Sequence, residues 1–358
     1  MKKYISLMTV LVMVVALLTG CMGTPVVIND CTCPAEGTNT PTTPTTPIPV
    51  NPVTKGAVKT GLAVMTTGAT PDEPGKVELD STMVAVMVDE KGVIVSCIID
   101  SVPATVTMDA NGNITSDINS PVVTKGELGA DYGMVAWGGA IAEWDAQIAA
   151  LEGFAMGKTV EELKNGAIDN TGKAPAGSDL ASSATIYLGG FVSAIERAVN
   201  NAQYLGADSG DRLHMVTLNK LSGSKNATAE EAGLVQLDAD VAAVTVKNGV
   251  ITSCIIDSVQ AKVNFDTTGT VTTDMSLEFP SKNELGESYG MVAWGGAIAE
   301  WNVQAASFAA DVTGKTAAEV AGIAINEATK PADGSDLSSS VTISIGGFQA
   351  LIAKALAE

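Results

Sequence analysis

The chain has 358 residues, with 20 Lys plus Arg against 40 Asp plus Glu, and therefore a formal net charge of −20. This length allows about two ordinary domains, and a hydrophobic content of 46% excludes a wholly disordered chain. The acidic balance excludes partners that need basic patches, namely nucleic acids and anionic membrane surfaces. His214 is the single histidine and no CxxCH segment occurs, so a His-rich metal cluster, a Ser/His/Asp triad in each domain and covalent c-type haem are excluded as well.

The first twenty residues resemble a bacterial lipoprotein signal peptide. Lys2 and Lys3 precede an apolar run, Ile5 to Leu18, that is too short to span a bilayer as a permanent helix. The run leads into Leu-Thr-Gly-Cys, which ends at Cys21 and resembles the lipobox. We expect lipidation of Cys21 and a protein held by lipid on the extracellular face of the cell membrane, because each buried CH₂ contributes about 0.8 kcal/mol. An ordinary secretory peptide with a chance cysteine is the alternative.

Residues 21–56 are rich in threonine and proline. Seven of the fourteen prolines fall between residues 25 and 52. Such a composition cannot build a core and favours extended polyproline geometry, at roughly 3.1 Å per residue. We expect a tether that holds the rest of the chain away from the membrane. Cys31 and Cys33 lie in this tether, and the sequence leaves open whether they pair with each other or with another chain.

The remainder of the chain consists of two copies of one sequence unit. The thirteen residues YGMVAWGGAIAEW occupy Tyr132 to Trp144 and recur at Tyr289 to Trp301, an offset of 157. The segment SCIIDSV, which begins at Ser96, recurs at the same offset. A period of this length is too long for a solenoid and indicates two homologous domains, which we place at residues 57–207 and 208–358.

Each unit is expected to place its strands before its helices. In the first unit, runs rich in β-branched residues predict strands at Thr82 to Val88, Val93 to Asp100 and Ala104 to Met108. A turn at residues 109–112 leads into a further strand from Ile114. This order predicts an antiparallel meander.

Helical patterns follow the strands. Helical spacing from Trp137 places Ile141, Trp144 and Ile148 on one face. Capping boxes predict the start of the next helix, at Thr159 with Glu162 and at Thr316 with Glu319. Matched apolar stripes predict a last helix in each unit: Phe191, Ile195 and Val199, then Phe348, Ile352 and Leu356. The predicted fold class is α+β, with a meander and packed helices in each of two homologous domains.

Serine and threonine precede the last predicted helix in both units. The segments read DLASSATI from Asp179 and DLSSSVTI from Asp336, and a glycine pair stands four residues after each threonine. A helix N-terminus offers unpaired N–H groups and the positive end of a dipole, so it stabilises a phosphate without Lys or Arg. The glycine pair indicates a tight turn or the close approach of a ligand. The plainer alternative is that the hydroxyl groups are N-caps.

These segments resemble the Ser-Gly-Ala-Thr motif of FMN-binding domains, in which a flavin transferase joins FMN to the threonine oxygen through a phosphoester. With the lipobox, the tether and the YGM…EW segment, almost the whole chain is similar to the tandem-domain lipoproteins of Gram-positive bacteria known as extracellular electron-transfer flavoproteins, some of which are pheromone precursors. The resemblance implies an FMN-binding-domain-like fold and two covalent FMN groups. The residues that it assigns to the cofactor are Thr185, Asp179 and Ser183 in the first unit and Thr342, Asp336 and Ser340 in the second.

The chain departs from the family motif in two ways. Ser183 and Ser340 stand where the family has glycine, and Val341 stands where it has alanine. The two units also differ from each other two residues after the threonine, where the first unit has Tyr187 and the second has Ser344.

All four tryptophans lie in the thirteen-residue repeat. Aromatic faces and methionine suit an isoalloxazine ring, which needs stacking and exclusion of water. We expect its lining to be Tyr132, Met134 and Trp137 in the first unit and Tyr289, Met291 and Trp294 in the second. The alternative is that these residues fill the seam between helix and sheet. Cys97 and Cys254 lie in apolar strands and are expected to be buried, unreactive thiols rather than a redox pair.

The leading hypothesis is a membrane-anchored carrier with two FMN groups, more a redox carrier than an enzyme with its own substrate. It would take electrons from a membrane quinone-linked redox chain and pass them to an external acceptor such as ferric iron. One alternative is a solute-binding lipoprotein, which usually holds one ligand between two lobes. Another is a surface spacer or adhesin, in which duplication only adds length. Visible absorbance of the purified protein separates the first hypothesis from the other two.

Overall fold

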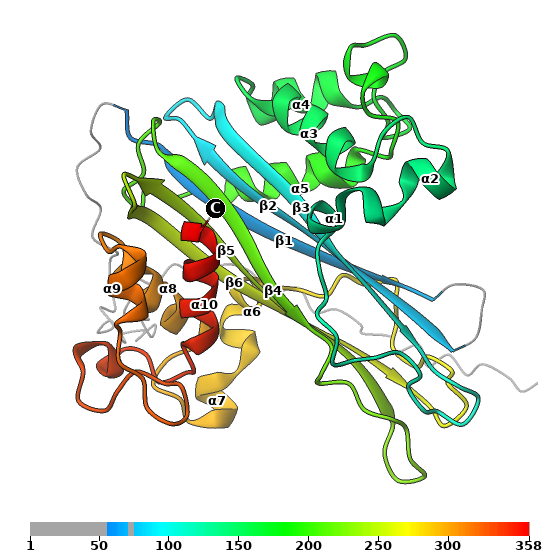
Figure 1. Cartoon of the computed structure of the whole chain (residues 1–358), viewed down its shortest axis with the longest axis vertical. Helices are drawn as coiled ribbons and strands as arrows, with labels where there is room; N and C mark the ends of the chain where they lie inside the picture. The colour runs from blue at the N-terminus through cyan, green and yellow to red at the C-terminus, as the bar shows by residue number, and fades with distance from the viewer. Residues whose placement is uncertain (1–55, 71–74, 358) are drawn as a thin grey trace, which may run out of the picture. The chain divides into compact units, whose positions relative to one another are not determined.

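The computed structural model of the chain describes residues 56–70 and 75–357 (Figure 1). The predicted signal peptide, Cys21, Cys31, Cys33 and the Thr/Pro-rich tether lie outside the described residues. The chain divides into two units, residues 1–48 and 49–358, and the described residues all belong to the second. Among the described residues, no helix is long and apolar enough to cross a membrane.

Each repeat contains one three-stranded antiparallel sheet. In the first repeat the strands are β1 (Lys59–Ala69), β2 (Lys76–Val88) and β3 (Ile94–Thr107), in the order β1-β2-β3. In the second repeat they are β4 (Arg212–Lys220), β5 (Gly233–Lys247) and β6 (Val250–Phe265), in the matching order. The structure therefore confirms the α+β class and the antiparallel pairing of each repeat.

The predicted strands were wrong in two details, and one strand was missed. Val93 to Asp100 and Ala104 to Met108 belong to the single strand β3, which continues through Pro103. Proline lacks an N–H group, but β3 is an edge strand and one side of it needs no partner. The strand expected from Ile114 is a single bridge to Met108. The missed strand is β1, which precedes the meander and pairs along the whole of β2 from Glu78 onward.

The helices follow the strands in both repeats. Those of the first repeat are α1 (Lys125–Leu128), α2 (Met134–Gly138), α3 (Trp144–Ala155), α4 (Val160–Ala167) and α5 (Gly189–Asn200). Those of the second are α6 (Lys282–Leu285), α7 (Met291–Gly295), α8 (Trp301–Val312), α9 (Ala317–Ala321) and α10 (Gly346–Ala357). Single 3₁₀ turns occupy Gly129–Tyr132, Leu180–Ser182, Gly286–Tyr289 and Asp336–Ser339. Both predicted capping boxes are confirmed at the starts of α4 and α9.

The helix predicted from Trp137 is two helices. Gly139, with a φ of 63°, ends α2 in the left-handed conformation, and the chain re-enters a helix only at Trp144. A left-handed glycine is a common helix stop because it carries no Cβ. Ile141 lies in the connection and is exposed, so it does not share the buried face of Trp144 and Ile148 as predicted.

The described residues form three hydrophobic clusters. One cluster lies between the first sheet and its helices and contains Trp144, Ile148, Leu151 and Ile195. The equivalent cluster of the second repeat contains Trp301, Phe308, Leu351 and Ile352. The third, here called the shared sheet core, joins the two sheets. The helices of each repeat lie against its own sheet (Figure 1). Each repeat therefore has a core beneath its own helices and contributes one sheet face to a core held in common.

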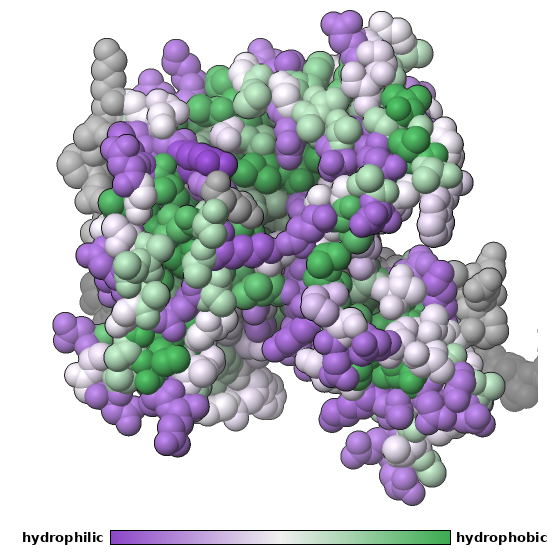
Figure 2. All heavy atoms as spheres, viewed as in Figure 1, coloured by the Kyte–Doolittle hydropathy of each residue, from purple (hydrophilic) through white to green (hydrophobic). Residues whose placement is uncertain are grey.

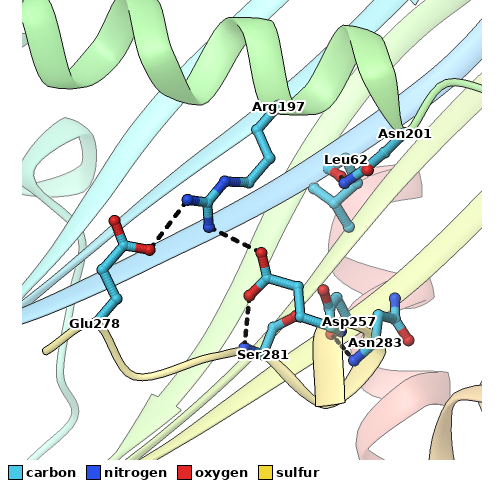
Figure 3. Close-up of polar contacts among 8 residues, drawn as sticks. Leu62, Arg197, Asn201, Asp257, Glu278, Ser281 and Asn283 are labelled. Carbon is cyan, nitrogen blue, oxygen red and sulfur yellow. Dashed lines mark hydrogen bonds and ion pairs between the residues drawn. The ribbon is translucent and has the colours of Figure 1, made fainter. Parts of the chain in front are cut away.

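Equivalent residues exchange equivalent contacts between the repeats. Arg197 on α5 reaches Glu278 and the start of α6 (Figure 3) and forms ion pairs with Glu278 and Glu284 at 3.0 and 2.8 Å. Lys354 on α10 stands 157 positions after Arg197 and pairs at 2.5 Å with Glu127, which stands 157 positions before Glu284. Such reciprocal contacts are those of a two-fold arrangement, here within one chain.

Candidate functional site

The two threonine segments occupy equivalent turns between a 3₁₀ turn and the last helix. Thr185 is exposed and Thr342 is half-buried. The residue before each threonine, Ala184 or Val341, is almost completely buried. Burial of that apolar side chain fixes the backbone while the threonine stays at the surface. Alanine and valine both meet this requirement, which explains why the second motif tolerates valine.

A buried glutamine holds each threonine. Gln147 Oε1 accepts hydrogen bonds from Thr185 N at 2.8 Å, from Ile186 N at 3.2 Å and from Thr185 Oγ1 at 3.3 Å. In the second repeat, Gln304 Oε1 accepts hydrogen bonds from Thr342 N at 2.7 Å and from Thr342 Oγ1 at 3.1 Å. Both glutamines are fully buried. Neither glutamine was among the residues predicted from the sequence.

The position of Gln147 follows from the apolar pattern of α3. Trp144, Gln147, Ile148 and Leu151 share one helix face, because residues three and four apart are neighbours on a helix surface. A polar side chain on this buried face needs partners. The threonine segment supplies them, 38 positions further along the chain. The sequence does contain a sign of this role, because a glutamine interrupts the apolar stripe of the helix in both repeats, at the offset of 157.

A glutamate joins α2 to the start of α3. The carboxylate of Glu143 accepts hydrogen bonds from Met134 N at 2.8 Å and Val135 N at 3.0 Å. Glu300 makes the same two bonds to Met291 N and Val292 N, at the same two distances. The carboxylate satisfies N–H groups that the first turn of a helix leaves unpaired. In each repeat, one stretch of five residues therefore holds both segments. The glutamate at its start, Glu143 or Glu300, holds the YGM…EW segment, and the glutamine at its end, Gln147 or Gln304, holds the threonine segment.

The structure divides the predicted flavin lining into two kinds of residue. Trp137 and Trp294 are 91% and 89% exposed, so neither fills the seam between helix and sheet. Trp144 and Trp301 do fill that seam, with exposures of 4% and 6%. The remaining predicted lining residues are half-buried and pack against the helix-covered cores: Tyr132, Met134, Tyr289 and Met291.

Other large apolar side chains are exposed beside both surface tryptophans. They are Val135 and Ile141 in the first repeat and Val292 and Ile298 in the second. On the face drawn in Figure 2, hydrophilic and apolar residues are interspersed over both repeats. The two repeats therefore expose a tryptophan at the same position, with exposed apolar residues at the same neighbouring positions in the sequence.

A lysine lies over the aromatic rings of each site, half-buried at Lys282 and buried at Lys125. Lys282 Nζ is 5.4 Å from the centroid of the Tyr289 ring and 4.8 Å from that of Trp301. Burial lowers the pKa of Lys282, although Asp238, Asp240 and Asp257 oppose this shift. Burial also raises the pKa of the Asp257 carboxyl group to about 6.

The first repeat contains the same arrangement. Lys125 Nζ lies 5.5 Å from the centroid of the Tyr132 ring and 5.6 Å from that of Trp144. It also pairs with Asp80 at 2.5 Å. In both repeats, therefore, a cation lies against the aromatic residues at the base of the site, in a protein that is otherwise acidic.

The predicted aspartates and serines lie at the surface of the same turns. Asp179 and Asp336 are exposed, and their backbone carbonyls accept hydrogen bonds from the hydroxyls of Ser182 and Ser339 at 2.6 and 2.7 Å. Ser183 is exposed. Ser340 is half-buried and donates to the carbonyl of Leu337 at 3.3 Å. The structure thus brings each aspartate and serine into the turn that presents the threonine.

The N-cap alternative and the glycine-pair interpretation are corrected for α5. Leu188 is its N-cap residue and makes no side-chain capping bond, so no serine or threonine caps this helix. Gly189 and Gly190 form its first turn. A Cβ on Gly189 would come within 2.5 Å of Tyr187 Oη, so the close approach is made by a side chain of this protein.

The prediction of buried, unreactive thiols is confirmed at the two cysteines that the structure describes. Cys97 and Cys254 are free and buried, and burial raises the pKa of both thiols, that of Cys254 to about 12. A thiol with so high a pKa is unreactive at neutral pH. No group of histidine, cysteine, aspartate and glutamate residues suited to a metal ion occurs in the described part.

A cleft of about 320 Å³ lies beside Tyr132 in the first repeat. Residues 67–69, 78–80 and 103–105 of its three strands complete the lining. In the second repeat, Gln260 stands at the position of Pro103, and its side chain donates to Asp238 at 2.9 Å. The cleft is therefore lined by one repeat only, which is not the arrangement of a ligand held between two lobes.

The sequence matches no protein-family model, and no curated protein or solved structure is significantly similar to it.

Proposed function

We propose that the protein is a lipid-anchored extracellular flavoprotein that carries electrons through two FMN groups, each joined to a threonine by a phosphoester. A flavin transferase attaches the groups to Thr185 and Thr342. The flavins accept electrons from a membrane quinone-linked redox chain and release them to an external acceptor such as ferric iron. The fold that corresponds to this function is FMN-binding-domain-like in each repeat.

The observation that carries the proposal is the surface threonine fixed by a buried glutamine in both repeats. Thr185 N and Thr342 N are 2.8 and 2.7 Å from their glutamine oxygens. The backbone is therefore held from below while the side chain stays accessible. A threonine that must enter the active site of a second enzyme needs this combination of a fixed backbone and an accessible hydroxyl group.

The surface tryptophans support the cofactor assignment. A side chain about nine-tenths exposed contributes little to folding, so Trp137 and Trp294 need another role. Each follows a helix start that Glu143 or Glu300 fixes, and the glutamine that fixes the threonine stands four residues after that glutamate. Stacking on a flat isoalloxazine ring gives these tryptophans a partner. When bound, FMN supplies the redox chemistry, and the chain supplies attachment, stacking and partial exclusion of water.

The experiment is coexpression with an active flavin transferase, followed by measurement of the intact mass. The wild-type protein should carry two FMN groups. Thr185→Ala and Thr342→Ala should each remove one, and the double variant should be colourless, folded and inactive in ferric iron reduction. Ser182→Ala and Ser339→Ala are matched controls, since each removes a hydroxyl group from the same turn and should leave both FMN groups in place.

Two results would overturn the proposal at different points. Covalent flavin on the double threonine variant would show that the sites are wrong. Wild-type protein that stays free of flavin beside an active transferase would exclude the flavoprotein function and leave the solute-binding lipoprotein and the surface spacer or adhesin as alternatives.

A further inference from the structure

We propose that Gln147 and Gln304 are positioning residues for FMN attachment, and that an uncharged amide is required at these positions because the group attached next to them is anionic. This inference rests on the proposed function. It concerns residues that the family resemblance does not assign, and it follows from the hydrogen bonds of the two buried glutamines.

The orientation of each glutamine amide is fixed by its second hydrogen bond. Gln147 Nε2 donates to the carbonyl of Ala142 at 2.8 Å, and Gln304 Nε2 donates to the carbonyl of Ala299 at 2.7 Å. A flipped amide would turn its NH₂ group toward the N–H of the threonine and its oxygen toward a carbonyl. Neither contact is a hydrogen bond. The oxygen is therefore held toward the threonine segment in both repeats.

Each glutamine oxygen binds the backbone N–H of the threonine more strongly than it binds the threonine hydroxyl group. This difference leaves the hydroxyl group available for attachment. The backbone N–H bonds, at 2.8 and 2.7 Å, are shorter than the hydroxyl bonds, at 3.3 and 3.1 Å. O–H···O bonds in proteins are usually about 2.7–2.8 Å, so the hydroxyl bond is the weak member. The glutamine thus fixes the backbone of the threonine without holding its hydroxyl group strongly.

The attachment step balances with a flavin dinucleotide as donor. The bond that forms joins threonine Oγ1 to the phosphorus of the flavin mononucleotide part. The phosphoanhydride bond of the donor breaks, and a nucleoside monophosphate leaves. The hydroxyl proton passes to a base of the transferase. The long hydroxyl bond to the glutamine is lost in this step, whereas the backbone bond remains.

A glutamate would keep the shape of the glutamine and change its charge. Its carboxylate would accept the same N–H bonds but would face the carbonyl of Ala299 without a proton. It would also place a negative charge beside an anionic phosphoester, and like charges repel more strongly where water is excluded. The glutamate variant should therefore attach flavin slowly at high pH and faster at low pH, where its carboxyl group is protonated.

The test measures the rate of flavin attachment at each threonine of the full chain. Purified transferase and the flavin dinucleotide are added, and peptides that contain Thr185 and Thr342 are quantified by mass spectrometry over time. Gln304→Leu and Gln304→Glu should each slow attachment at Thr342 by about tenfold or more. In the leucine variant the cause is the loss of the buried hydrogen bonds, and in the glutamate variant it is the repulsion between two negative charges. Attachment at Thr185 should keep its wild-type rate and is the internal reference.

Gln349→Leu is the matched control. Gln349 donates two hydrogen bonds in the same repeat, to the carbonyls of Val320 and Ile323 at 2.9 and 3.0 Å, but does not contact the threonine. Its replacement should leave both attachment rates unchanged. Gln304→Glu should recover part of its rate between pH 8 and pH 6, whereas Gln304→Leu should not. A merely structural role for Gln304 would not produce this difference.

The outcomes separate the inference from the function on which it rests. If the wild type accepts flavin at both threonines and both Gln304 variants react at Thr342 at the wild-type rate, the positioning role is wrong and the flavoprotein function stands. If Gln304→Glu is slow but does not respond to pH, the charge argument is wrong. If the wild type accepts no flavin, the proposed function and this inference fall together.

Discussion

The two repeats hold their threonines alike and surround them differently. The glutamine beneath each threonine, the glutamate at each helix start and the exposed tryptophan are repeated. The side chains two positions after each threonine are not: Tyr187 follows Thr185, and Ser344 follows Thr342. The first repeat also has Glu152 where the second has Ala309. The parts that define the site are therefore constant, and the variation lies in its neighbours.

One of these differences is a matched pair of changes. In the first repeat Gly172 has a φ of 76°, and a Cβ there would lie 2.2 Å from the ring of Tyr187. In the second repeat Thr329 takes the place of Gly172 with a φ of 57°, and its Oγ1 shares a hydrogen bond of 2.5 Å with Ser344 Oγ. The large ring needs glycine beside it, whereas serine leaves room for threonine. The geometry indicates that threonine fits at the position of Gly172 only where the side chain at the position of Tyr187 is small.

The largest expected effect comes from the buried tryptophans. Trp144→Ala and Trp301→Ala should each lower the free energy of unfolding by about 3–5 kcal/mol, because each deletes a buried ring. The rings lie 6.0 Å from Phe191 and 5.8 Å from Phe348, centroid to centroid, in edge-to-face geometry. Urea unfolding of the full chain measures the change. Clearly unequal losses would contradict equivalent packing in the two repeats.

The exposed tryptophans are the control for this comparison. Trp137→Ala and Trp294→Ala should change the free energy of unfolding by no more than about 0.5 kcal/mol, as surface substitutions usually do. If they destabilise the protein as strongly as the buried pair, these rings are packing residues and the proposed stacking role loses its basis.

The matched pair of changes gives the next largest effect. Gly172→Thr should destabilise the protein by about 1–3 kcal/mol, from overpacking against Tyr187 and from backbone strain at positive φ. Combined with Tyr187→Ser, it reproduces the second repeat and should recover most of the loss. A double-mutant cycle by urea unfolding measures the coupling. Additive effects of the two substitutions would show that these positions vary independently.

Glu152 gives the first repeat a titrating group that has no counterpart in the second, where Ala309 stands at its position. Burial raises the pKa of this carboxyl group to about 7, although the N–H of Ile99 donates to it at 2.7 Å. The folded protein therefore binds this proton more tightly than the unfolded chain, so the contribution of Glu152 to stability falls as the pH rises from about 4.5 to about 7. Glu152→Gln should raise the melting temperature by a few degrees at pH 8 and leave it nearly unchanged at pH 4.

The exposed substitution Glu161→Gln, on α4, is the control for this effect and should shift the melting temperature equally at both pH values. A rise at pH 4 as large as the rise at pH 8 would exclude titration of Glu152 as the cause.

The smallest expected effect concerns the reciprocal ion pairs. Arg197→Ala and Lys354→Ala should each cost about 1 kcal/mol or less, since partly exposed ion pairs contribute little. The cost should shrink at 1 M salt. Arg197 contacts two glutamates and Lys354 one, so the arginine variant should lose more. A larger loss at Lys354 would contradict this order.

Local patterns predicted the features of the fold that depend on nearby residues. The capping boxes, the last helix of each repeat and the buried Cys97 and Cys254 follow from short-range spacing and apolar runs. The continuity of β3 through Pro103 did not follow, because it depends on whether the strand lies at a sheet edge. The exposure of Ile141 depends on a glycine stop at Gly139 that spacing alone does not reveal.

The candidate site divides in the same way. The sequence pointed to the threonines, the aspartates and the tryptophan segment as candidates, but not to the glutamine that bonds each threonine. Gln147 meets Thr185 across 38 positions, and a contact of that range is decided by the packing of α3. A polar residue on the buried face of a predicted helix breaks the apolar pattern. It indicates a hydrogen-bond partner elsewhere in the fold.

The central claim is that both threonines carry FMN. The most direct measurement is peptide mass mapping of the wild-type chain after coexpression with a flavin transferase. We predict the mass of one FMN on the peptide that contains Thr185 and of one on the peptide that contains Thr342, with all other peptides unmodified. Unmodified threonine peptides, together with full modification of a known substrate by the same transferase, would contradict the account.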